Sequence, residues 1–432
     1  MRIILFFLLG FVCVSLLSGQ EIEVQPAVDG VFNEWSNSGQ QTLTDPVGDA
    51  TGAFDIKTVT VQDFNFDLYL NLELDSSLNL QSGPKSDRTL KIDLDLGDCG
   101  TLLIDFRGRT ATLNKGDSIR PVPWQEIGFV SLPTYAADRF EMRLKLRDFG
   151  VQEGDVVKIN FSGSDELDKP IRQIFSKQSA ITGLPAKVEQ PTQKADFRIA
   201  NINTLRNGLI DKTRGPLLRA AIESSEADIV CVQEEWKKEK FDTGVSFLQG
   251  EIAEHVIWFG GCGILSRHPI ERLPMTLDRA VAGLVTFDDG RQVTVISVHF
   301  KAAGFAGSKE DKLRIQQATQ LVSEIEKMRN QQFGKEAMQA PVIVIGDYNL
   351  VGSRKPLDIL LAAGLSEVLP VRQGNGFAHT WQGLKEDESF WPGRLDLLTQ
   401  AGLKSLNAEV MESETNRYSD HFMLVGDFAF PE

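Results

Sequence analysis

The chain has 432 residues, enough for one to three domains, and 42% hydrophobic with 24% charged residues is typical of a globular protein with a large core. A net charge of −15 argues against a broad electrostatic grip on nucleic acid or on an anionic membrane, so any phosphate-binding site must be local. Four cysteines at irregular spacing form neither a zinc motif nor a disulfide framework, although a Cys231–Cys262 bridge remains open.

The first nineteen residues have the pattern of a secretory signal peptide. Arg2 supplies a positive start, residues 3–17 are nearly all apolar, and the small residues Ser18 and Gly19 precede polar sequence. The apolar run is short for a membrane span, and no later segment is long and apolar enough to span. We therefore expect removal of residues 1–19, no transmembrane span in the remainder, and a secreted or periplasmic protein.

Residues 20–180 show the pattern of an all-β domain. Apolar and polar residues alternate strictly over 68–74, 90–96 and 140–146, which indicates half-buried antiparallel strands. Turn-forming clusters separate these runs, for example at 82–84, 97–98 and 154–155. The natural solution for such a pattern is a β-sandwich.

The opening of this domain carries a resemblance to a known group of modules. The stretches VDGVFNEWSNS, DPVGDATGAFDI and DLYLNLEL are similar to family-9-like carbohydrate-binding sandwiches and their DOMON relatives. The resemblance implies a glycan partner, and a bound Ca²⁺ near the acidic loop with Asp45, Asp49 and Asp55 as oxygen ligands. The alternative is a structural sandwich whose turn-rich surface loop binds nothing.

Residues 181–195 contain two prolines and are polar, which predicts a linker. From residue 196 to 432 the pattern changes to alternating strands and helices, which predicts a second domain. Strands are expected at 197–202, 228–232, 256–259, 262–266, 282–287, 292–300, 342–345, 395–398 and 422–428, and helices at 215–225, 308–331 and 355–363.

The run at 342–345 is made of four β-branched residues and predicts a strand buried on both faces. Asp347 and Asn349 follow it, one residue apart. This spacing can point two oxygen-bearing side chains into one crevice, where a hard cation such as Mg²⁺ finds its preferred ligands. Taken alone, the same pair also fits an ordinary Asx-rich turn.

Other polar residues lie at the ends of the other predicted strands in the same domain. Asn201 and Glu234 follow two early strands, and His299 ends the strand at 292–300. Asp396 lies in GRLDLL, and the Asp420–His421 pair lies just before the last strand. Ligands of layered α/β proteins gather at strand ends. We therefore expect these side chains to share one site.

The series ANINT, ADIVCVQEEW, GILSRHPI, VISVHFKA, VIGDYNL, AHTW, GRLDLL and YSDHF resembles the endonuclease/exonuclease/phosphatase superfamily, in the family order. The resemblance covers residues 196 to 430. It implies a four-layer α/β/β/α sandwich and Mg²⁺- or Mn²⁺-dependent phosphoester hydrolysis. The whole chain is thus expected to be α+β, with this catalytic domain preceded by the all-β sandwich.

The resemblance also assigns the metal and phosphate sites residue by residue. Glu234 matches the principal metal-ligating glutamate, Asn201 the asparagine beside it, and Asp420 the carboxylate at the metal. Arg279, in DRAVAGLVTF, matches a phosphate-contacting arginine.

The remaining residues match catalytic roles. Asp347 and Asn349 match the pair that orients the attacking water and grips the phosphate. His421 matches the histidine that acts on the water or the phosphate, and Asp396 the acid that holds its ring. His299 matches the second histidine of deoxyribonuclease-like members, placed to protonate the leaving oxygen.

These assignments predict a secreted phosphodiesterase of nuclease type, acting as a monomer on DNA or RNA. The alternatives are a lipid, inositol or sugar phosphatase, or a sphingomyelinase-like enzyme, on the same scaffold. A further alternative, from a different class, is a glycan-binding protein whose second domain has lost activity.

Overall fold

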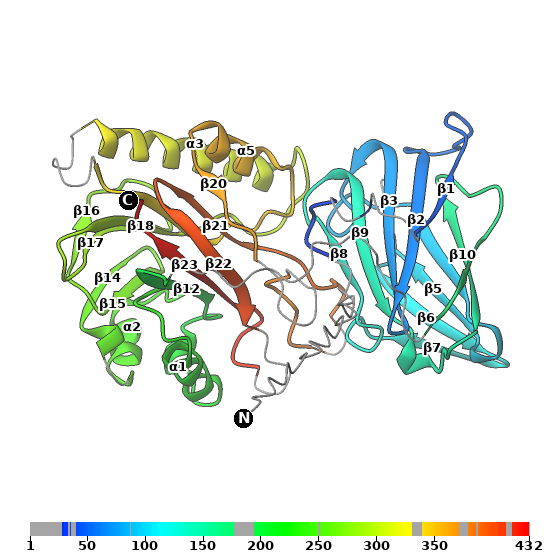
Figure 1. Cartoon of the computed structure of the whole chain (residues 1–432), viewed down its shortest axis with the longest axis horizontal. Coiled ribbons are helices and arrows are strands. Elements are labelled where there is room, and N and C mark those ends of the chain that lie inside the picture. The colour runs from blue at the N-terminus through cyan, green and yellow to red at the C-terminus, as the bar shows by residue number, and fades with distance from the viewer. Residues whose placement is uncertain are drawn as a thin grey trace, which may run out of the picture.

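A computed structural model describes residues 28–32, 35, 40–86, 88–176, 194–248, 251–330, 339–370, 379–385, 388–411 and 417–431. The predicted signal peptide and nearly all of the predicted linker lie outside these residues. The described chain forms an N-terminal half (28–176) and a C-terminal half (194–431), which lie side by side in Figure 1. No helix in the described part of the chain is long and apolar enough to cross a membrane.

The N-terminal half consists of two antiparallel sheets, with the strand orders β1-β2-β3-β9-β8 and β11-β10-β4-β5-β6-β7. The first sheet contains β1 (Gln41–Thr44), β2 (Ile56–Phe64), β3 (Asp67–Leu78), β8 (Val130–Leu132) and β9 (Ala137–Lys145). The second contains β4 (Leu90–Asp95), β5 (Thr101–Asp105), β6 (Thr110–Lys115), β7 (Ser118–Val122), β10 (Val156–Gly163) and β11 (Ile171–Ile174).

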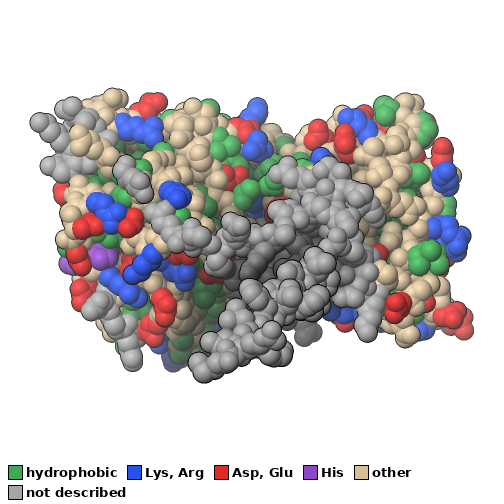
Figure 2. All heavy atoms as spheres, viewed as in Figure 1, with side chains coloured by type: hydrophobic (Ala, Val, Ile, Leu, Met, Phe, Trp, Pro, Cys, Tyr) green, Lys and Arg blue, Asp and Glu red, His purple; other side chains and the backbone are tan. Residues whose placement is uncertain are grey.

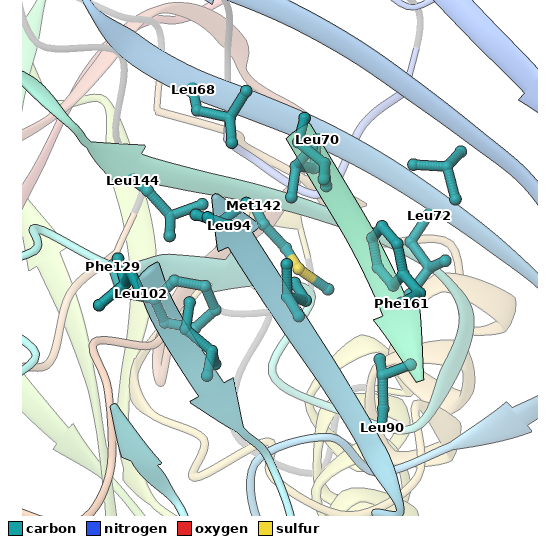
Figure 3. Close-up of a cluster of buried hydrophobic side chains, with 14 of the residues drawn as sticks. Leu68, Leu70, Leu72, Leu90, Leu94, Leu102, Phe129, Met142, Leu144 and Phe161 are labelled. Atoms are coloured by element: carbon teal, nitrogen blue, oxygen red, sulfur yellow. The ribbon is translucent and has the colours of Figure 1, made fainter. Parts of the chain in front are cut away.

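The alternating residues of these strands supply one continuous hydrophobic core. Leu70 and Met142 come from the first sheet, and Leu94 and Phe161 come from the second; all four are buried in the same cluster (Figure 3). The three alternating runs found in the sequence thus form β3, β4 and β9. One member of the cluster, Trp391, belongs to the C-terminal half of the chain.

The C-terminal half consists of two mixed sheets, with the strand orders β14-β15-β13-β12-β23-β22 and β16-β17-β18-β19-β21-β20. One contains β12 (Phe197–Asn203), β13 (Ile229–Gln233), β14 (His255–Phe259), β15 (Cys262–Ser266), β22 (Lys404–Met411) and β23 (Met423–Ala429). The other contains β16 (Ile270–Leu273), β17 (Ala280–Thr286), β18 (Gln292–His299), β19 (Val342–Asp347), β20 (Ser366–Glu367) and β21 (Asp396–Ala401).

Helices pack on one face of each of these sheets, and the opposite faces share a core. The helices α1 (Arg214–Ser224) and α2 (Lys238–Val245) bury residues with the β12–β13 sheet, and α3 (Lys309–Arg329) and α5 (Lys355–Ala362) bury residues with the β18–β19 sheet (Figure 1). Side chains from both sheets, including Ile199, Ile264, Val295 and Ile345, form a third cluster. Strands buried on both faces explain the continuous apolar runs in the sequence.

The helix predicted at 308–331 is confirmed as α3. Ser308 is its N-cap, and the side chain of Ser308 accepts a hydrogen bond from the Asp311 backbone at 3.2 Å. Ala318, Leu321, Ile325 and Met328 form the buried stripe. The strands predicted around 197–202, 292–300 and 342–345 are also confirmed, as β12, β18 and β19.

Candidate active site

Three of the predicted site residues lie side by side where three neighbouring strands meet. His299 of β18 pairs in parallel register with Asp347 of β19, and Asp347 pairs in antiparallel register with Asp396 of β21. The glycine before Asp347 allows this close approach, because a Cβ at Gly346 would lie 2.0 Å from the Val298 carbonyl oxygen. The strand order therefore brings a histidine and two carboxylates together, as the sequence predicted.

His421 reaches the same place from the other sheet. Its Nδ1 lies 2.7 Å from an oxygen of Asp396, and both residues are buried. Asp396 also accepts a hydrogen bond from Asn201 at 3.0 Å, and its backbone N–H donates to Thr380 at 2.9 Å. This contact lets Asp396 fix the ring orientation of His421. The catalytic role predicted for the pair stays a prediction.

Asp347 lies between the two histidines. Its Oδ2 is 3.6 Å from Nε2 of His299 and 3.8 Å from Nε2 of His421, and it accepts a hydrogen bond from Asn203 at 3.0 Å. Burial raises the pKa of Asp347 to about 7, against the lowering effect of His421. Burial alone would lower the pKa of His421, but Asp396 and Asp347 raise it to about 10.

His299 has the opposite electrostatic environment. It is 3% exposed, and burial together with the nearby Arg279 lowers its pKa to about 3. The imidazole is therefore neutral near pH 7. A neutral ring can donate one hydrogen bond to a phosphate oxygen but is a weak proton donor, so the general-acid role implied by the resemblance remains a prediction.

An exposed tryptophan forms one side of the site. Trp236 is 38% exposed, and its ring centroid lies 5.4 Å from that of His299. The guanidinium of Arg279 lies 5.0 Å from the centre of the Trp236 ring, within the range of a cation–π contact. Arg279 also joins His299 through the backbone, because its carbonyl accepts the His299 N–H at 2.9 Å. The predicted phosphate-contacting arginine therefore lies beside the predicted catalytic histidine.

Glu234 follows β13 and is reached by Asn203 rather than Asn201. The Asn203 amide nitrogen lies 3.5 Å from Oε1 of Glu234, and Oε2 accepts the Arg206 backbone N–H at 3.0 Å. Asn201, two residues earlier on β12, instead bonds to Asp396 and accepts a hydrogen bond from Gln233 at 2.7 Å. Asn203 was not among the predicted site residues; its alternation with Asn201 on one strand face is the signal that could have revealed it.

Backbone strain collects at this site. Glu234, Arg279 and Asn349 have φ values of 63°, 56° and 47°, in the left-handed region that non-glycine residues rarely adopt. The Asn349 backbone N–H donates to Asp347 at 2.9 Å, and its amide donates to the Phe300 carbonyl at 3.3 Å. Backbone strain of this kind persists only where the surrounding structure holds it, and it is common at active sites.

Asp420 is the predicted site residue with the least direct connection to the others. Oδ2 of Asp420 accepts a hydrogen bond from the indole of Trp381 at 3.2 Å, and Oδ1 accepts one from Ser419. The described residues show no hydrogen bond between Asp420 and Glu234. The predicted roles of Asp420, Glu234 and Asn201 as metal ligands stay predictions.

The residues around Glu234 fit a hard divalent cation. Glu234 supplies a partly exposed carboxylate, Asp347 supplies a second carboxylate nearby, and Asn203 joins the two. Mg²⁺ favours such oxygen ligands, and it uses few of them because it keeps waters and binds substrate phosphate. A site with one principal carboxylate is therefore compatible with Mg²⁺ or Mn²⁺.

A separate acidic cluster lies in the N-terminal half. One ligand atom from each of Asp45, Asp49, Asp55 and Asp165 lies within 4.8 Å of the others. Asp45 and Asp55 are each 4% exposed, and each has one buried carboxylate oxygen without a hydrogen-bond partner. Burial, with Asp165 and Asp49 nearby, raises the pKa of Asp45 to about 6. The sequence identified three of these acids and missed Asp165.

The cysteines do not form a disulfide among the described residues. Cys231 and Cys262 are free and fully buried in the core between the two C-terminal sheets, and Cys99 is also free. The bridge that the sequence left open is therefore not formed.

Comparison with known proteins gives structural neighbours only. No family model and no curated protein matches the chain. An endonuclease/exonuclease/phosphatase family protein from Leptotrichia buccalis covers 54% of this chain and 100% of its own, with 17% identity and a TM-score of 0.38. ANGEL2, a 2',3'-cyclic phosphatase, covers 55% and 96%, with 16% identity and a TM-score of 0.41. The AP endonuclease LMAP from Leishmania major covers 55% and 88%, with 11% identity and a TM-score of 0.39.

Proposed function

We propose that the chain is a metal-dependent phosphoester hydrolase, and that its activity is that of a phosphodiesterase of nuclease type. The observation that carries the proposal is the continuous buried arrangement of Asp396, His421, Asp347 and His299 beside Glu234. Two histidines and two carboxylates in one chain of contacts at strand ends, with shifted pKa values, are the kind of cluster that marks functional sites. Such a set suits phosphoryl chemistry, which needs positioning and charge stabilisation.

Each residue has a role that its contacts support. Asp347, with Asn349 bonded to it, would orient the attacking water, and His421, held by Asp396, would stabilise the phosphate charge. Arg279 would contact a phosphate oxygen, and the neutral His299 would donate a hydrogen bond to the phosphate, whereas the resemblance implies that it protonates the leaving oxygen. Glu234, supported by Asn203, would hold the Mg²⁺ or Mn²⁺, which when bound supplies neutralisation of the phosphate charge.

The first experiment asks whether the purified protein cleaves phosphoesters at all. DNA, RNA, sphingomyelin, inositol phosphates and bis(p-nitrophenyl) phosphate would be assayed with Mg²⁺ or Mn²⁺. Glu234→Gln should lower kcat by orders of magnitude and leave the fold intact, because a neutral amide balances the cation poorly. Glu226→Gln, at an exposed acid with φ 53°, is the matched control and should retain activity. Unchanged turnover in excess EDTA would remove the metal from the proposal.

The substrate panel also separates the alternatives. Lys and Arg side chains are interspersed with Asp and Glu on the face shown in Figure 2. With a net charge of −15, this disfavours a processive nuclease but not a metal-assisted one. Hydrolysis of inositol phosphates or sphingomyelin alone would support the phosphatase or sphingomyelinase-like alternative. Binding of glycans without turnover of any phosphoester would support an inactive glycan-binding protein. Secretion or periplasmic location, the signal peptide and the monomeric state belong to the same proposal.

We also propose that the four-aspartate cluster of the N-terminal half binds Ca²⁺. Two buried oxygens without hydrogen-bond partners and four acids in close contact support a cation there. Added Ca²⁺ should raise the melting temperature of the wild type, since a ligand that binds only the folded state stabilises it. Asp55→Asn should abolish the shift, whereas Asp98→Asn, at an exposed acid in the same half, should keep it. An equal shift in both variants would refute the site.

A further inference from the structure

Two loops of the N-terminal half contact the segments that carry the candidate catalytic residues. The first loop, residues 133–136, joins β8 to β9. The hydroxyl of Thr134 accepts the backbone N–H of Arg394 at 2.9 Å, two residues before Asp396. The backbone N–H of Ala136 donates to the Gly352 carbonyl at 2.7 Å. Tyr135, between them, packs against the core that α3 and α5 share with β19.

The second loop, residues 79–82, follows β3 and reaches the segment after β19. The amide nitrogen of Asn79 donates to the carbonyls of Val351 and Gly352, at 3.0 and 3.3 Å. Its amide oxygen accepts the backbone N–H of Ala306 at 2.8 Å. Ser82 donates a further hydrogen bond to the Val351 carbonyl at 2.7 Å. Asn79, which is 5% exposed, therefore joins the segment that follows Asn349 to the segment that follows His299.

The C-terminal half makes the reciprocal insertion with Trp391. This side chain is 1% exposed and lies in edge-to-face contact with Phe106, Trp124 and Phe129 of the N-terminal half, with ring centroids 5.3 to 5.5 Å apart. The Gln81 side chain donates a hydrogen bond to the Trp391 backbone carbonyl. Aromatic pairs with this geometry favour one fixed arrangement. The segment from Trp391 to Asp396 is therefore anchored in the N-terminal half.

A short path of hydrogen bonds leads from this anchor to the histidine. Thr380 accepts the backbone N–H groups of Leu395 and Asp396, at 3.0 and 2.9 Å, and its own N–H donates to Gly393. Asp396 then holds His421 at 2.7 Å. Only a few hydrogen bonds therefore connect the N-terminal sandwich to Asp396 and His421.

We propose that the N-terminal sandwich is a structural part of the active site, in which Thr134 and Asn79 are positioning residues for Asp396 and for Asp347 with Asn349. The proposal rests on the proposed phosphoester hydrolysis for its kinetic readout. The Thr134 hydroxyl accepts the Arg394 N–H two residues before Asp396, and the Asn79 amide donates to the carbonyls of Val351 and Gly352, which follow Asn349. Each loop therefore fixes a different part of the site. Small displacements of such groups reduce turnover strongly, because reactive geometry tolerates little error.

The experiment uses the full-length chain and two variants. Thr134→Val removes the acceptor of the Arg394 N–H while keeping the shape of the side chain, and Asn79→Ala removes the bonds to residues 306, 351 and 352. Each should lower kcat on bis(p-nitrophenyl) phosphate by roughly ten-fold or more, with KM within about two-fold. Amide hydrogen exchange should accelerate in peptides covering 347–353 for Asn79→Ala and 391–397 for Thr134→Val. Thr134→Ser should restore the wild-type kcat, because its hydroxyl again accepts the bond.

Matched controls come from the same sheet. Thr60, on β2, bonds to Thr42 at 3.1 Å, and Asn71, on β3, accepts a bond from Arg139 at 3.0 Å. Thr60→Val and Asn71→Ala should change the melting temperature by amounts similar to those of Thr134→Val and Asn79→Ala. Unlike those variants, they should leave kcat within about two-fold of the wild-type value.

The outcomes separate the proposal from the function on which it rests. If Thr134→Val and Asn79→Ala both keep the wild-type kcat and the wild-type rates of amide hydrogen exchange, the positioning role is overturned. If the wild-type protein hydrolyses no phosphoester, the proposed function fails, and the exchange rates alone decide whether the sandwich holds the two segments. A loss of kcat in Thr134→Val that Thr134→Ser does not restore would also overturn the role of the Thr134 hydroxyl.

Discussion

At the residue scale, the candidate site separates two histidines by environment. His421 contacts two carboxylates, which raise its pKa, whereas His299 is buried next to Arg279, which lowers its pKa. Asp347 contacts both rings from one carboxylate oxygen. In the proposed reaction the pair would therefore offer one charged ring and one neutral ring to the substrate phosphate, and the two rings need not share one role.

The leaving group of the substrate can test the role of His299. DNA expels a basic sugar alkoxide, which leaves poorly unless it is protonated, whereas nitrophenolate leaves readily as an anion. Because the His299 ring is neutral, we expect it to act as a hydrogen-bond donor to the phosphate, so His299→Ala should slow both substrates by similar factors. The measurement is kcat/KM on DNA and on bis(p-nitrophenyl) phosphate.

The opposite result has a clear meaning. A loss of about 10²-fold or more on DNA, with little loss on the nitrophenyl ester, would establish His299 as the general acid implied by the sequence resemblance. His268→Ala provides the control, since His268 lies at Asp288 and Phe287 and contacts none of the site residues described above. It should leave both rates unchanged.

At the scale of elements, the strands that carry the site could be predicted because they are buried on both faces. The run before Asp347 and the runs before Asn201 and His299 are almost continuously apolar, and all three are central strands. The site residues could then be predicted at the ends of these strands, because neighbouring parallel strands end at the same edge of a sheet. The pairing of Asp347 with both Asp396 and His299 follows from the order of the strands β18, β19 and β21.

Other elements lacked such signals. Helix α2 has eight residues with Gly244 near its end, and its sequence KEKFDTGV buries only Phe241 and Gly244. The edge strands β16 and β22 are half exposed, so their apolar pattern is weak. The choice of Asn203 over Asn201 at Glu234 depends on where β12 ends and on the turn at 205–207, where three residues have positive φ. Local sequence patterns do not fix such turn geometry.

At the scale of the molecule, the two halves exchange side chains across their boundary. Trp391 of the C-terminal half enters the sandwich core, and Tyr135 of the sandwich packs against the core of the other half. The sequence predicted a linker between two domains. Nothing in its composition shows that Trp391 belongs to the hydrophobic core of the N-terminal sandwich. Long-range packing of this kind arises from three-dimensional shape, which a one-dimensional pattern does not report.

A buried histidine at this boundary gives the boundary a predicted acid sensitivity. His379 is 5% exposed, its ring contacts Phe422 at 5.4 Å, and burial lowers its pKa to about 3, with Arg143 of the sandwich and Arg417 lowering it further. An unfolded histidine titrates near pH 6.5, so below that pH the unfolded chain binds a proton that the folded chain excludes. The stability contribution is therefore complete above about pH 6.5, and it falls as the pH drops toward 3.

We expect the free energy of unfolding to decrease by up to ~1.4 kcal/mol per pH unit from this group alone across that window. Urea unfolding at pH 8, 6, 5 and 4 would measure the decrease, and His379→Gln should give a shallower acid limb, because the amide binds no proton. His255→Gln, on the half-buried edge strand β14, is the control and should keep the wild-type slope. An acid limb of unchanged slope in His379→Gln would contradict the assignment. Arg143 and Arg417 belong to different halves, and both already disfavour a charge on His379. Protonation of His379 should therefore loosen the boundary, and exposure of the Trp391 indole should accompany the loss of stability. Because the chain has six tryptophans, the difference in fluorescence between the wild type and Trp391→Phe during the same titration measures that exposure.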